Sequence, residues 1–282
     1  MTIEPVSLTA FYCAGVRMED AESPAPLGGD RLATRLMDDA GRATYQPFRR
    51  FTLPNRSNVV RHRMVDDLIR AALREDRDRL IVLVGSGLDT RAFRLGRGRW
   101  VELDAPGIIA HKERLLPAAE AAVPLERIPI SFASERIEDK LARYRGSERP
   151  LVILEGVSMY LTREQIATTA AALAALFPEH QLVADLMSAK FGRRFGGPLH
   201  RELVRLGTRF GEGASDRPER LWTEHGYRHL GSESIVARAH QLGVIPIPRI
   251  VLSTLLGELV RGYQIHRFER GDAAYLGGSE RT

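Results

Sequence analysis

The sequence predicts an α/β protein with a doubly wound sheet of seven strands and interleaved helices. Two apolar runs without a polar break, Leu80–Val84 and Leu151–Leu154, are typical of strands buried on both faces of a parallel sheet. Helical segments alternate with the predicted strands, and this alternation builds such a sheet. The chain has 282 residues, 44% of them hydrophobic, which is enough for one large domain or two small ones with a sizeable core.

The composition points to a soluble cytoplasmic protein. The single cysteine, Cys13, allows no intrachain disulfide and fits a reducing compartment. The first residues include Glu4 and Pro5 and resemble no signal peptide. No apolar run approaches the ~20 residues that a membrane span requires, so we expect no membrane partner.

The formal charge of +5 raises the question of a nucleic-acid partner. The arginines that carry it are scattered and interleaved with acids, as in the segment 74–79. We therefore expect no nucleic-acid partner.

The segment 1–55 is predicted to form a cover over the ligand side of the sheet. Short helices are expected near Thr9–Asp20 and Arg31–Asp39, around a loop at Ala21–Asp30 that is rich in proline, glycine and acids. Aromatic residues argue against disorder here, namely Phe11, Tyr12, Tyr45, Phe48 and Phe51. Residues 56–282 would then form the core.

The first core helix is predicted over Asn58–Leu73, with Ser57 or Asn58 as its N-cap. Helical spacing places Arg63 on the polar face and Arg61 on the apolar side, where a charge needs a partner. Arg61 either pairs with a structural acid or grips a ligand carboxylate with two nitrogens, and the sequence leaves both readings open.

The turn Gly85-Ser86-Gly87 follows the strand Leu80–Val84 and allows backbone N–H groups to approach a nucleotide-like ligand. Thr90 stands where a dinucleotide fingerprint has its third glycine, so that fingerprint fails. The next strand, Trp100–Leu103, ends in Asp104, which is placed to bind a ribose diol or to cap a helix from Ile108.

The third strand is predicted over Ile128–Phe132, and its last residues, Ser131 and Phe132, border an adenine or belong to a surface loop. The fourth strand, Leu151–Leu154, ends in Glu155-Gly156, a charge at the edge where open sheets bind ligands. A capping box at Thr162–Gln165 starts the helix Arg163–Leu176.

The fifth strand, Gln181–Ala184, ends in Asp185, and a long insertion at about 187–231 is predicted to be a substrate lid. The remaining elements are expected as a helix, a strand, a helix and a strand at Arg220–Glu224, Tyr227–Leu230, Ser232–Leu242 and within Gly257–Glu269, before a frayed end.

Four blocks of the chain resemble the leucine carboxyl methyltransferase family, in its bacterial small-molecule branch with tetracenomycin-type O-methyltransferases. The blocks are Leu53-Pro54-Asn55-Arg56 through Arg61 to Asp66-Asp67; Val84-Gly85-Ser86-Gly87-Leu88-Asp89-Thr90-Arg91 with Arg94-Leu95; Trp100-Val101-Glu102-Leu103-Asp104-Ala105-Pro106 with Lys112; and Glu155-Gly156-Val157-Ser158-Met159-Tyr160-Leu161.

The resemblance implies a class I methyltransferase fold, Rossmann-like, that uses S-adenosylmethionine (SAM). Arg61 would grip the methionine carboxylate, Asp104 the ribose hydroxyls, and Glu155 would lie near the amine and sulfonium. The residues that the resemblance implies for cofactor binding are Arg61, Gly85, Ser86, Gly87, Asp104, Ala105, Ser131, Phe132, Glu155 and Gly156.

The chain departs from the family at two places. Ser131-Phe132 replaces the family's acid and apolar residue at the adenine edge, so Glu135 is a candidate substitute. The family often has a lysine near the site in its N-terminal segment, and here Arg49 or Arg50 is the candidate replacement.

The resemblance implies SAM-dependent O-methylation of a carboxylate or hydroxyl on a small molecule from secondary metabolism. It implies a monomer or homodimer without a metal. Tyr160 is expected to position the acceptor, and a hydroxyl acceptor would also need a general base. The histidines His62, His200, His225 and His229 are each expected to be structural or exposed. Two alternatives remain: a protein C-terminal carboxyl methyltransferase and a nicotinamide-dependent oxidoreductase.

Overall fold

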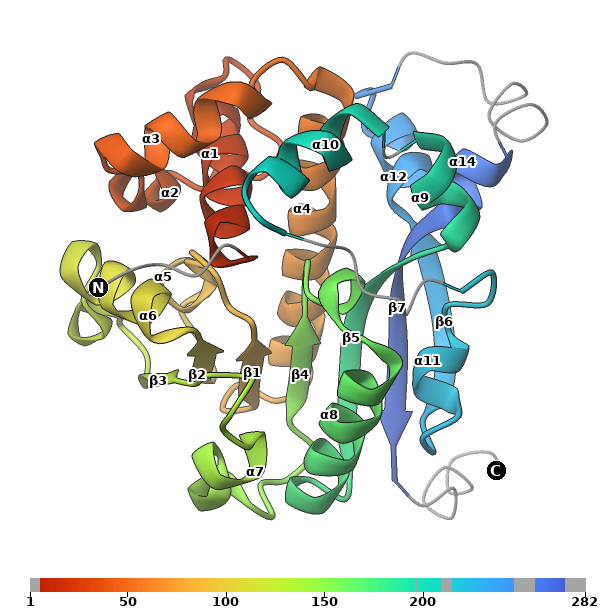
Figure 1. Ribbon diagram of the computed structural model, residues 1–282. Helices are drawn as coiled ribbons and strands as arrows, with labels where there is room; N and C mark the ends of the chain where they lie inside the picture. The colour runs from red at the N-terminus through yellow and green to blue at the C-terminus, as the bar shows by residue number, and fades with distance from the viewer. Residues whose placement is uncertain (1–5, 196, 209–214, 246–256, 272–282) are drawn as a thin grey trace, which may run out of the picture.

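The computed structural model describes residues 6–195, 197–208, 215–245 and 257–271, and shows a central sheet with helices on both faces (Figure 1). The sheet has seven strands in the order β3-β2-β1-β4-β5-β7-β6. The first five pair in parallel, and β7 runs antiparallel between β5 and β6. The strands are β1 Leu80–Val84, β2 Arg99–Asp104, β3 Leu125–Pro129, β4 Leu151–Leu154, β5 His180–Met187, β6 Arg228–Ser234 and β7 Tyr263–Arg270.

The helices divide into a cover, a core and an insertion. The cover consists of α1 Thr9–Glu22, α2 Leu32–Leu36 and α3 Asp39–Tyr45. The core helices are α4 Thr52–Glu75, α5 Arg91–Leu95, α6 Pro106–Leu115, α7 Ile137–Lys140, α8 Arg163–Leu176, α11 Arg220–Thr223, α12 Ile235–Gln241 and α14 Gly257–Gly262. The insertion after β5 begins with α9 Ala189–Phe195 and α10 Gly197–Arg205.

The side chains of β1 alternate between two hydrophobic clusters, as a strand covered on both faces requires. Leu80, Val82 and Val84 pack on the face that carries α7, α8 and α11. Ile81 and Leu83 pack on the opposite face, against α4 and α12. This arrangement confirms the predicted doubly wound sheet and brings the carboxyl ends of β1, β2 and β4 to one edge.

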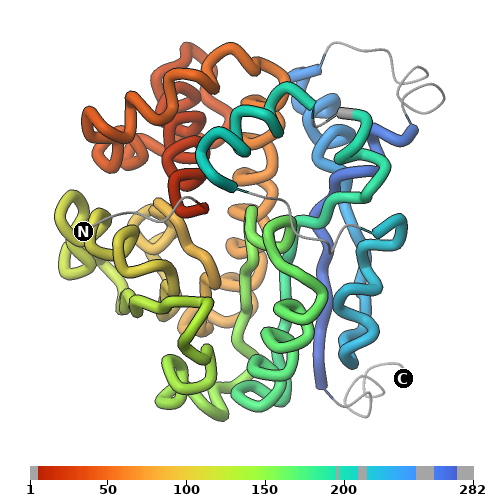
Figure 2. Tube along the Cα trace, in the orientation of Figure 1, coloured from red at the N-terminus to blue at the C-terminus, as the bar shows by residue number. Residues whose placement is uncertain are grey.

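A third cluster joins the cover to the insertion above that edge. It holds aromatic residues of the cover, such as Phe11 and Phe48, together with Leu203 of α10. Figure 2 shows the teal trace of α10 beside the red and orange cover. Arg50, after the 3-10 turn Gln46–Phe48, pairs with Glu202 of α10.

The predicted start of the first core helix is wrong. Helix α4 begins at Thr52 and has no side-chain cap, so Ser57 and Asn58 lie within it. Pro54 sits in the first turn, where the missing N–H has no intrahelical partner to lose. Asn58 instead donates its amide to Cys13 Sγ of α1, at 3.4 Å.

Other boundaries also differ from the expectation. Strand β3 lies three residues before the predicted position, because the chain after Ile130 folds into a turn that Glu135 closes by accepting from the Ser131 N–H at 2.7 Å. The predicted last strand begins as helix α14, and only Tyr263 onward pairs with β5. The expected helix Arg31–Asp39 is split, since Asp38 caps a separate helix α3. The expected frayed end lies outside the described residues.

Two further boundaries move by a few residues. Strand β5 runs through Asp185 to Met187 instead of ending before the acid. Strand β6 extends to Ser234, whose side chain then caps α12. Within the described ranges, no helix has both the length and the apolar character needed to cross a bilayer.

Candidate cofactor site

A cavity of 330 Å³ lies at the carboxyl ends of β1, β2 and β4, under helix α1. Tyr160 and nine of the ten residues expected at the cofactor line it: Arg61, Gly85, Ser86, Gly87, Asp104, Ala105, Phe132, Glu155 and Gly156. Ser131 is not part of the lining. The segments that carry these residues are far apart in the chain, and the parallel sheet brings them together.

The glycine turn is tied to β2 and has little room for side chains. Gly85 and Gly87 have positive φ angles of 72° and 51°, which glycine adopts without strain. A Cβ on Gly85 would lie 2.5 Å from Val157, and one on Gly87 would lie 3.3 Å from Ala10 of the cover. The backbone N–H groups of Gly85 and Ser86 donate to Leu103 O at 2.9 and 3.0 Å.

Asp104 closes the turn from the side of β2. Its Oδ2 accepts from the Gly87 N–H at 2.6 Å, and its Oδ1 accepts from the Ala105 N–H at 2.7 Å. The carboxyl is buried, and this burial raises its pKa despite the two backbone donors. Each oxygen keeps a lone pair for a further donor.

The hydroxyl of Ser86, unpartnered among the described residues, indicates that a polar ligand fits the cavity. Its hydroxyl oxygen is buried and has no hydrogen-bond partner among the described residues. A buried polar atom without a partner is costly, and a ligand such as SAM would relieve it. The residues present therefore fit a nucleoside-bearing cofactor.

Arg61 enters the cavity from α4 and already holds two carboxylates. Its Nε donates to Glu155 at 3.1 Å, while its Nη1 donates to Asp185 at 3.1 Å and to the Tyr263 hydroxyl at 2.8 Å. Its Nη2 contacts only the weak acceptor Cys13 Sγ, at 3.7 Å, among the contacts within the described chain. The pairing of Arg61 with structural acids is thus confirmed. Its grip on a ligand carboxylate stays a prediction, for which Nη2 is the nitrogen without an oxygen acceptor among the described residues.

Behind Arg61 lies a buried ion network that the sequence did not reveal. Arg91 donates to Asp66 and Glu155, at 2.6 Å each, and also to Asp89. Arg94 adds a second guanidinium, 2.8 Å from Asp66. These arginines belong to the motif after the glycine turn, and their spacing alone did not distinguish them from surface residues.

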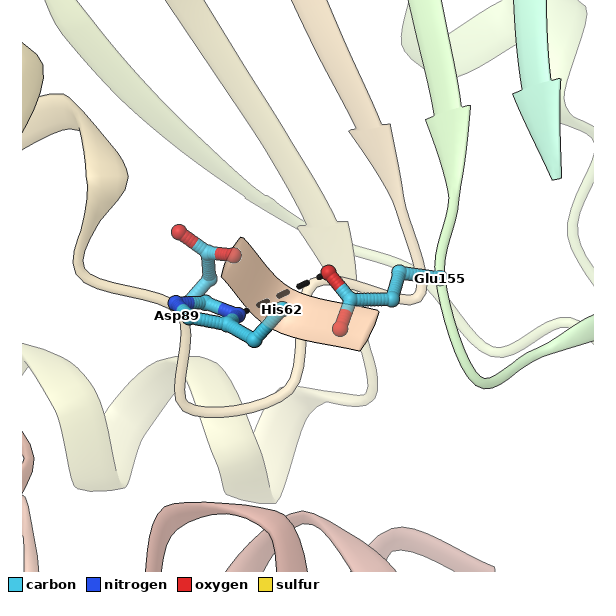
Figure 3. A group of neighbouring side chains, drawn as sticks. All are labelled: His62, Asp89 and Glu155. Atoms are coloured by element: carbon cyan, nitrogen blue, oxygen red, sulfur yellow. Dashed lines mark ion pairs between the residues drawn. The ribbon is translucent and has the colours of Figure 1, made fainter. Parts of the chain in front are cut away.

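His62, Asp89 and Glu155 face one another across this network (Figure 3). Their possible ligand atoms lie within 4.8 Å of one another, as in a metal site. Arg91 contacts all three side chains and supplies the positive charge that such a group requires. The guanidinium of Arg91 therefore accounts for the close approach of His62, Asp89 and Glu155, and the cluster needs no metal ion to balance its charge.

The protonation states follow from these surroundings. Burial alone would raise the pKa of Glu155, but Arg91, His62 and Arg61 outweigh it and hold the pKa well below its usual range. Burial, and then Arg91, lower the pKa of His62. Burial raises the pKa of Tyr160. At neutral pH, Glu155 is an anion, His62 is neutral and Tyr160 keeps its proton.

The three substitutes expected from the sequence do not reach the cavity. The carboxylate of Glu135 pairs with Lys140 at 2.6 Å, away from the lining. Arg49 pairs with Glu19 of the cover, and Arg50 pairs with Glu202 of α10. Of the two residues predicted at the adenine edge, Phe132 lines the cavity and is 42% exposed, and its contact with adenine stays a prediction.

Sequence comparison places the chain among methyltransferases. A putative SAM-dependent methyltransferase of Parafrankia sp. is 35% identical over 176 residues, which cover 57% of this chain and 56% of that protein. Another, of Streptomyces coelicolor, is 31% identical over 142 residues, 44% of this chain and 46% of that protein. The chain thus matches about half the length of these two relatives.

A longer match is the tetracenomycin polyketide synthesis O-methyltransferase TcmP of Streptomyces glaucescens. It is 26% identical over 243 residues, which cover 76% of this chain and 87% of that protein.

Solved structures show the same fold. A putative methyltransferase of Thermobifida fusca aligns with a TM-score of 0.54 at 15% identity, covering 91% of this chain and 94% of that one. A DUF574 family protein of Streptomyces avermitilis aligns with a TM-score of 0.54 at 12% identity, covering 92% of this chain and 97% of that one.

The sequence model described as leucine carboxyl methyltransferase matches residues 10–174, which is more than half of the chain. This stretch includes the glycine turn, Asp104 and Glu155, the residues that shape the cavity. The chain therefore belongs to the leucine carboxyl methyltransferase family of SAM-dependent methyltransferases.

Proposed function

We propose that this protein transfers the methyl group of SAM to an oxygen of a small molecule, and that the oxygen belongs to a carboxylate. The observation that carries the proposal is the cavity itself. Its floor offers Asp104, Glu155 and Nη2 of Arg61, which contacts only the weak acceptor Cys13 Sγ among the described residues, while residues of the cover line its roof.

Three residues would hold the cofactor by its polar groups. Asp104 would accept from the ribose hydroxyls with its remaining lone pairs, and Nη2 of Arg61 would donate to the methionine carboxylate. Ionised Glu155 would attract the amine. When bound, SAM supplies a methyl group on a sulfonium that needs alignment and exclusion of water more than activation.

Among the described residues, the cavity offers no uncommitted group to remove a proton from a hydroxyl, since Asp104 would hold the ribose and Asp89 pairs with Arg91. Glu155 is held by Arg61 and Arg91, and both ring nitrogens of His62 face arginine nitrogens. Tyr160 stays protonated because burial raises its pKa. A carboxylate is ionised at neutral pH and needs no base, so it suits this site better than an aliphatic hydroxyl.

Above the floor, the lining comes from the cover and from the turn after β4. It includes small and polar residues of the cover, such as Ser7, Thr9 and Ala10, with Tyr160 opposite. The Tyr160 hydroxyl interacts with Thr9, whose own hydroxyl donates to Val6 O at 2.7 Å. Tyr160 would position the acceptor through its hydroxyl and ring, and the cover would exclude water.

A small acceptor is favoured because the cover and α10 pack together over the site. TcmP, the relative with the longest of the three matches above, is named for a reaction of polyketide synthesis, which supports a secondary metabolite as acceptor. A nicotinamide cofactor is disfavoured by the buried Thr90, whose hydroxyl donates to Asp30 at 2.8 Å where a dinucleotide site has a glycine.

The test uses SAM labelled on its methyl group, the purified protein and a bacterial cell extract. We expect the label in the small-molecule fraction, and we expect alkali to release it as methanol, because an ester hydrolyses. Label in protein would favour the C-terminal carboxyl alternative. Label that resists alkali would show transfer to a hydroxyl and contradict the carboxylate assignment.

A further inference from the structure

We propose that Asp185 and Tyr263 are positioning residues for the cofactor. They would hold the guanidinium of Arg61 so that one nitrogen, Nη2, is left for the methionine carboxylate. The inference rests on the proposed function, because it assigns Arg61 to that carboxylate. Neither residue lines the cavity, so both would act through the groups that they hold.

Asp185 joins two parts of the cavity wall. Its Oδ1 accepts from the Gly156 N–H at 2.6 Å and thereby fixes the turn after β4. Its Oδ2 accepts from Arg61 Nη1 at 3.1 Å and also from the hydroxyl of Tyr263. The side chain is fully buried, and both of its oxygens are hydrogen-bonded by these three donors.

Tyr263 completes the grip on Arg61 from a different strand. Its hydroxyl accepts from Arg61 Nη1 at 2.8 Å while donating to Asp185. In the antiparallel register, Tyr263 lies opposite Met187, two residues beyond Asp185 on the same face. That face carries α4, the helix of Arg61. The pairing of β5 with β7 thus creates the contact.

These contacts determine how Arg61 meets a ligand. Nε is taken by Glu155, and Nη1 is taken by Asp185 and Tyr263. Without the Tyr263 hydroxyl, Nη1 would lack one acceptor and the guanidinium could turn toward the cavity in other orientations. A planar guanidinium held on two sides presents its third nitrogen in one direction, which favours a single contact with a carboxylate.

The first helix of the insertion supports this arrangement. The ring of Phe191 in α9 packs on the ring of Tyr263, with centroids 5.9 Å apart. Gly262 makes room for that ring, since a Cβ there would lie 2.5 Å from Phe191. The insertion is therefore connected to Arg61 through the phenol that it covers.

The test measures calorimetric affinities of Tyr263→Phe for S-adenosylhomocysteine and for its decarboxylated analogue. We expect the variant to bind S-adenosylhomocysteine about five- to tenfold more weakly than the wild type. We expect no change for the analogue, because it lacks the group that Arg61 would hold. A merely structural role would weaken both ligands alike, and that result would overturn the inference.

Tyr227→Phe is the matched control. It removes the same kind of hydroxyl, one that lies 2.9 Å from His180 Nε2, and Tyr227 does not line the cavity. Both affinities should remain at wild-type values in this variant.

Asp185→Asn is a second variant that keeps the shape of the side chain. It should lose more affinity for S-adenosylhomocysteine than Tyr263→Phe, again without an effect on the analogue. Unchanged affinity in both variants would refute the positioning role alone. A wild-type protein that binds neither ligand would refute the proposed function as well.

Discussion

Arg61 is one of the residues at which the buried ion network meets the cavity. We expect Arg61→Ala to weaken S-adenosylhomocysteine binding at least about tenfold, because a charged hydrogen bond is lost. It should also lower the free energy of unfolding by about 3–5 kcal/mol, since two buried carboxylates lose their partner. Calorimetry and urea unfolding measure the two effects.

Arg63→Ala is the control for that substitution. Arg63 lies two residues away on the same helix and makes a surface pair with Asp67 at 3.0 Å, with its own side chain 44% exposed. Removing it should change stability by less than about 1 kcal/mol and leave the affinity unaltered. Equal affinities of the two variants would contradict the assignment of Arg61.

A second prediction for a single residue concerns Asp104 and the ribose of the cofactor. In Asp104→Asn, the amide nitrogen would face a backbone N–H of Gly87 or Ala105, two donors in opposition. We expect at least about tenfold weaker binding of S-adenosylhomocysteine. The same loss should appear with 5′-methylthioadenosine, which keeps the ribose but lacks the amino-acid part. A loss confined to S-adenosylhomocysteine would show that Asp104 does not hold the ribose.

Cavity residues could be predicted from the sequence where they lie at the end of a recognisable strand. Gly87, Asp104 and Glu155 each lie at or just after the end of a recognisable strand, and a parallel sheet brings these strand ends together. Tyr263 could not be predicted in this way, because it reads as one apolar member of an alternating strand. Its contact with Arg61 depends on the register of β5 with β7, which no local pattern specifies.

At the scale of elements, helix α8 offers a direct test of local stability. The Thr162 side chain accepts from the Gln165 N–H at 3.2 Å, and the Gln165 side chain accepts from the Thr162 N–H at 2.8 Å. We expect Thr162→Ala to cost about 1 kcal/mol in free energy of unfolding. Urea unfolding should show this without a change in cofactor affinity.

Thr168→Ala is the matched control on the same helix. Thr168 is exposed in the helix interior, where alanine has the higher helix propensity. This change should leave stability equal or slightly increased. A loss as large as that of Thr162→Ala would mean that the cap itself contributes nothing.

Elements could be predicted well when one local signal dominates. Strands β1 and β4 are short apolar runs, and α8 has its capping box, so all three appear with the expected bounds. The segment Gly257–Glu269 carries competing signals, and its first part packs as helix α14 beside α9 and α12. Tertiary packing decides such cases, and the sequence pattern does not contain it.

At the scale of the whole molecule, one set of charges joins the cover to the floor of the site. Arg17 of α1 pairs with Asp30 at 2.9 Å and donates at 2.7 Å to the carbonyl oxygen of Leu88, the residue after the glycine turn. Arg94 lies 3.4 Å from the same Asp30 and 2.8 Å from Asp66. The cover is thus fixed to the cofactor turn by the network that also holds Arg91.

That network makes the stability of the fold depend on pH. Burial alone would raise the pKa of Asp66, but His62, Arg91 and Arg94 outweigh it and hold the pKa well below its usual range. A carboxyl with a depressed folded-state pKa stabilises the fold above its unfolded pKa, and that stabilisation is lost as pH falls through the folded pKa. The free energy of unfolding should therefore fall as pH drops below about 4.

Asp66→Asn tests this dependence, because asparagine resembles the protonated carboxyl. At neutral pH the variant should be less stable than the wild type by about 3–5 kcal/mol, since Arg91 and Arg94 lose a buried partner. Below about pH 4 the unfolded wild-type chain takes up a proton at this carboxyl while the folded protein keeps it ionised, which stabilises the unfolded state. The difference between the two unfolding free energies should therefore narrow. Asp67→Asn, one residue along and 34% exposed, should change stability by less than about 1 kcal/mol throughout. Urea unfolding at a series of pH values measures all three proteins, and a difference that stays constant into acid would show that Asp66 is not held ionised by these arginines.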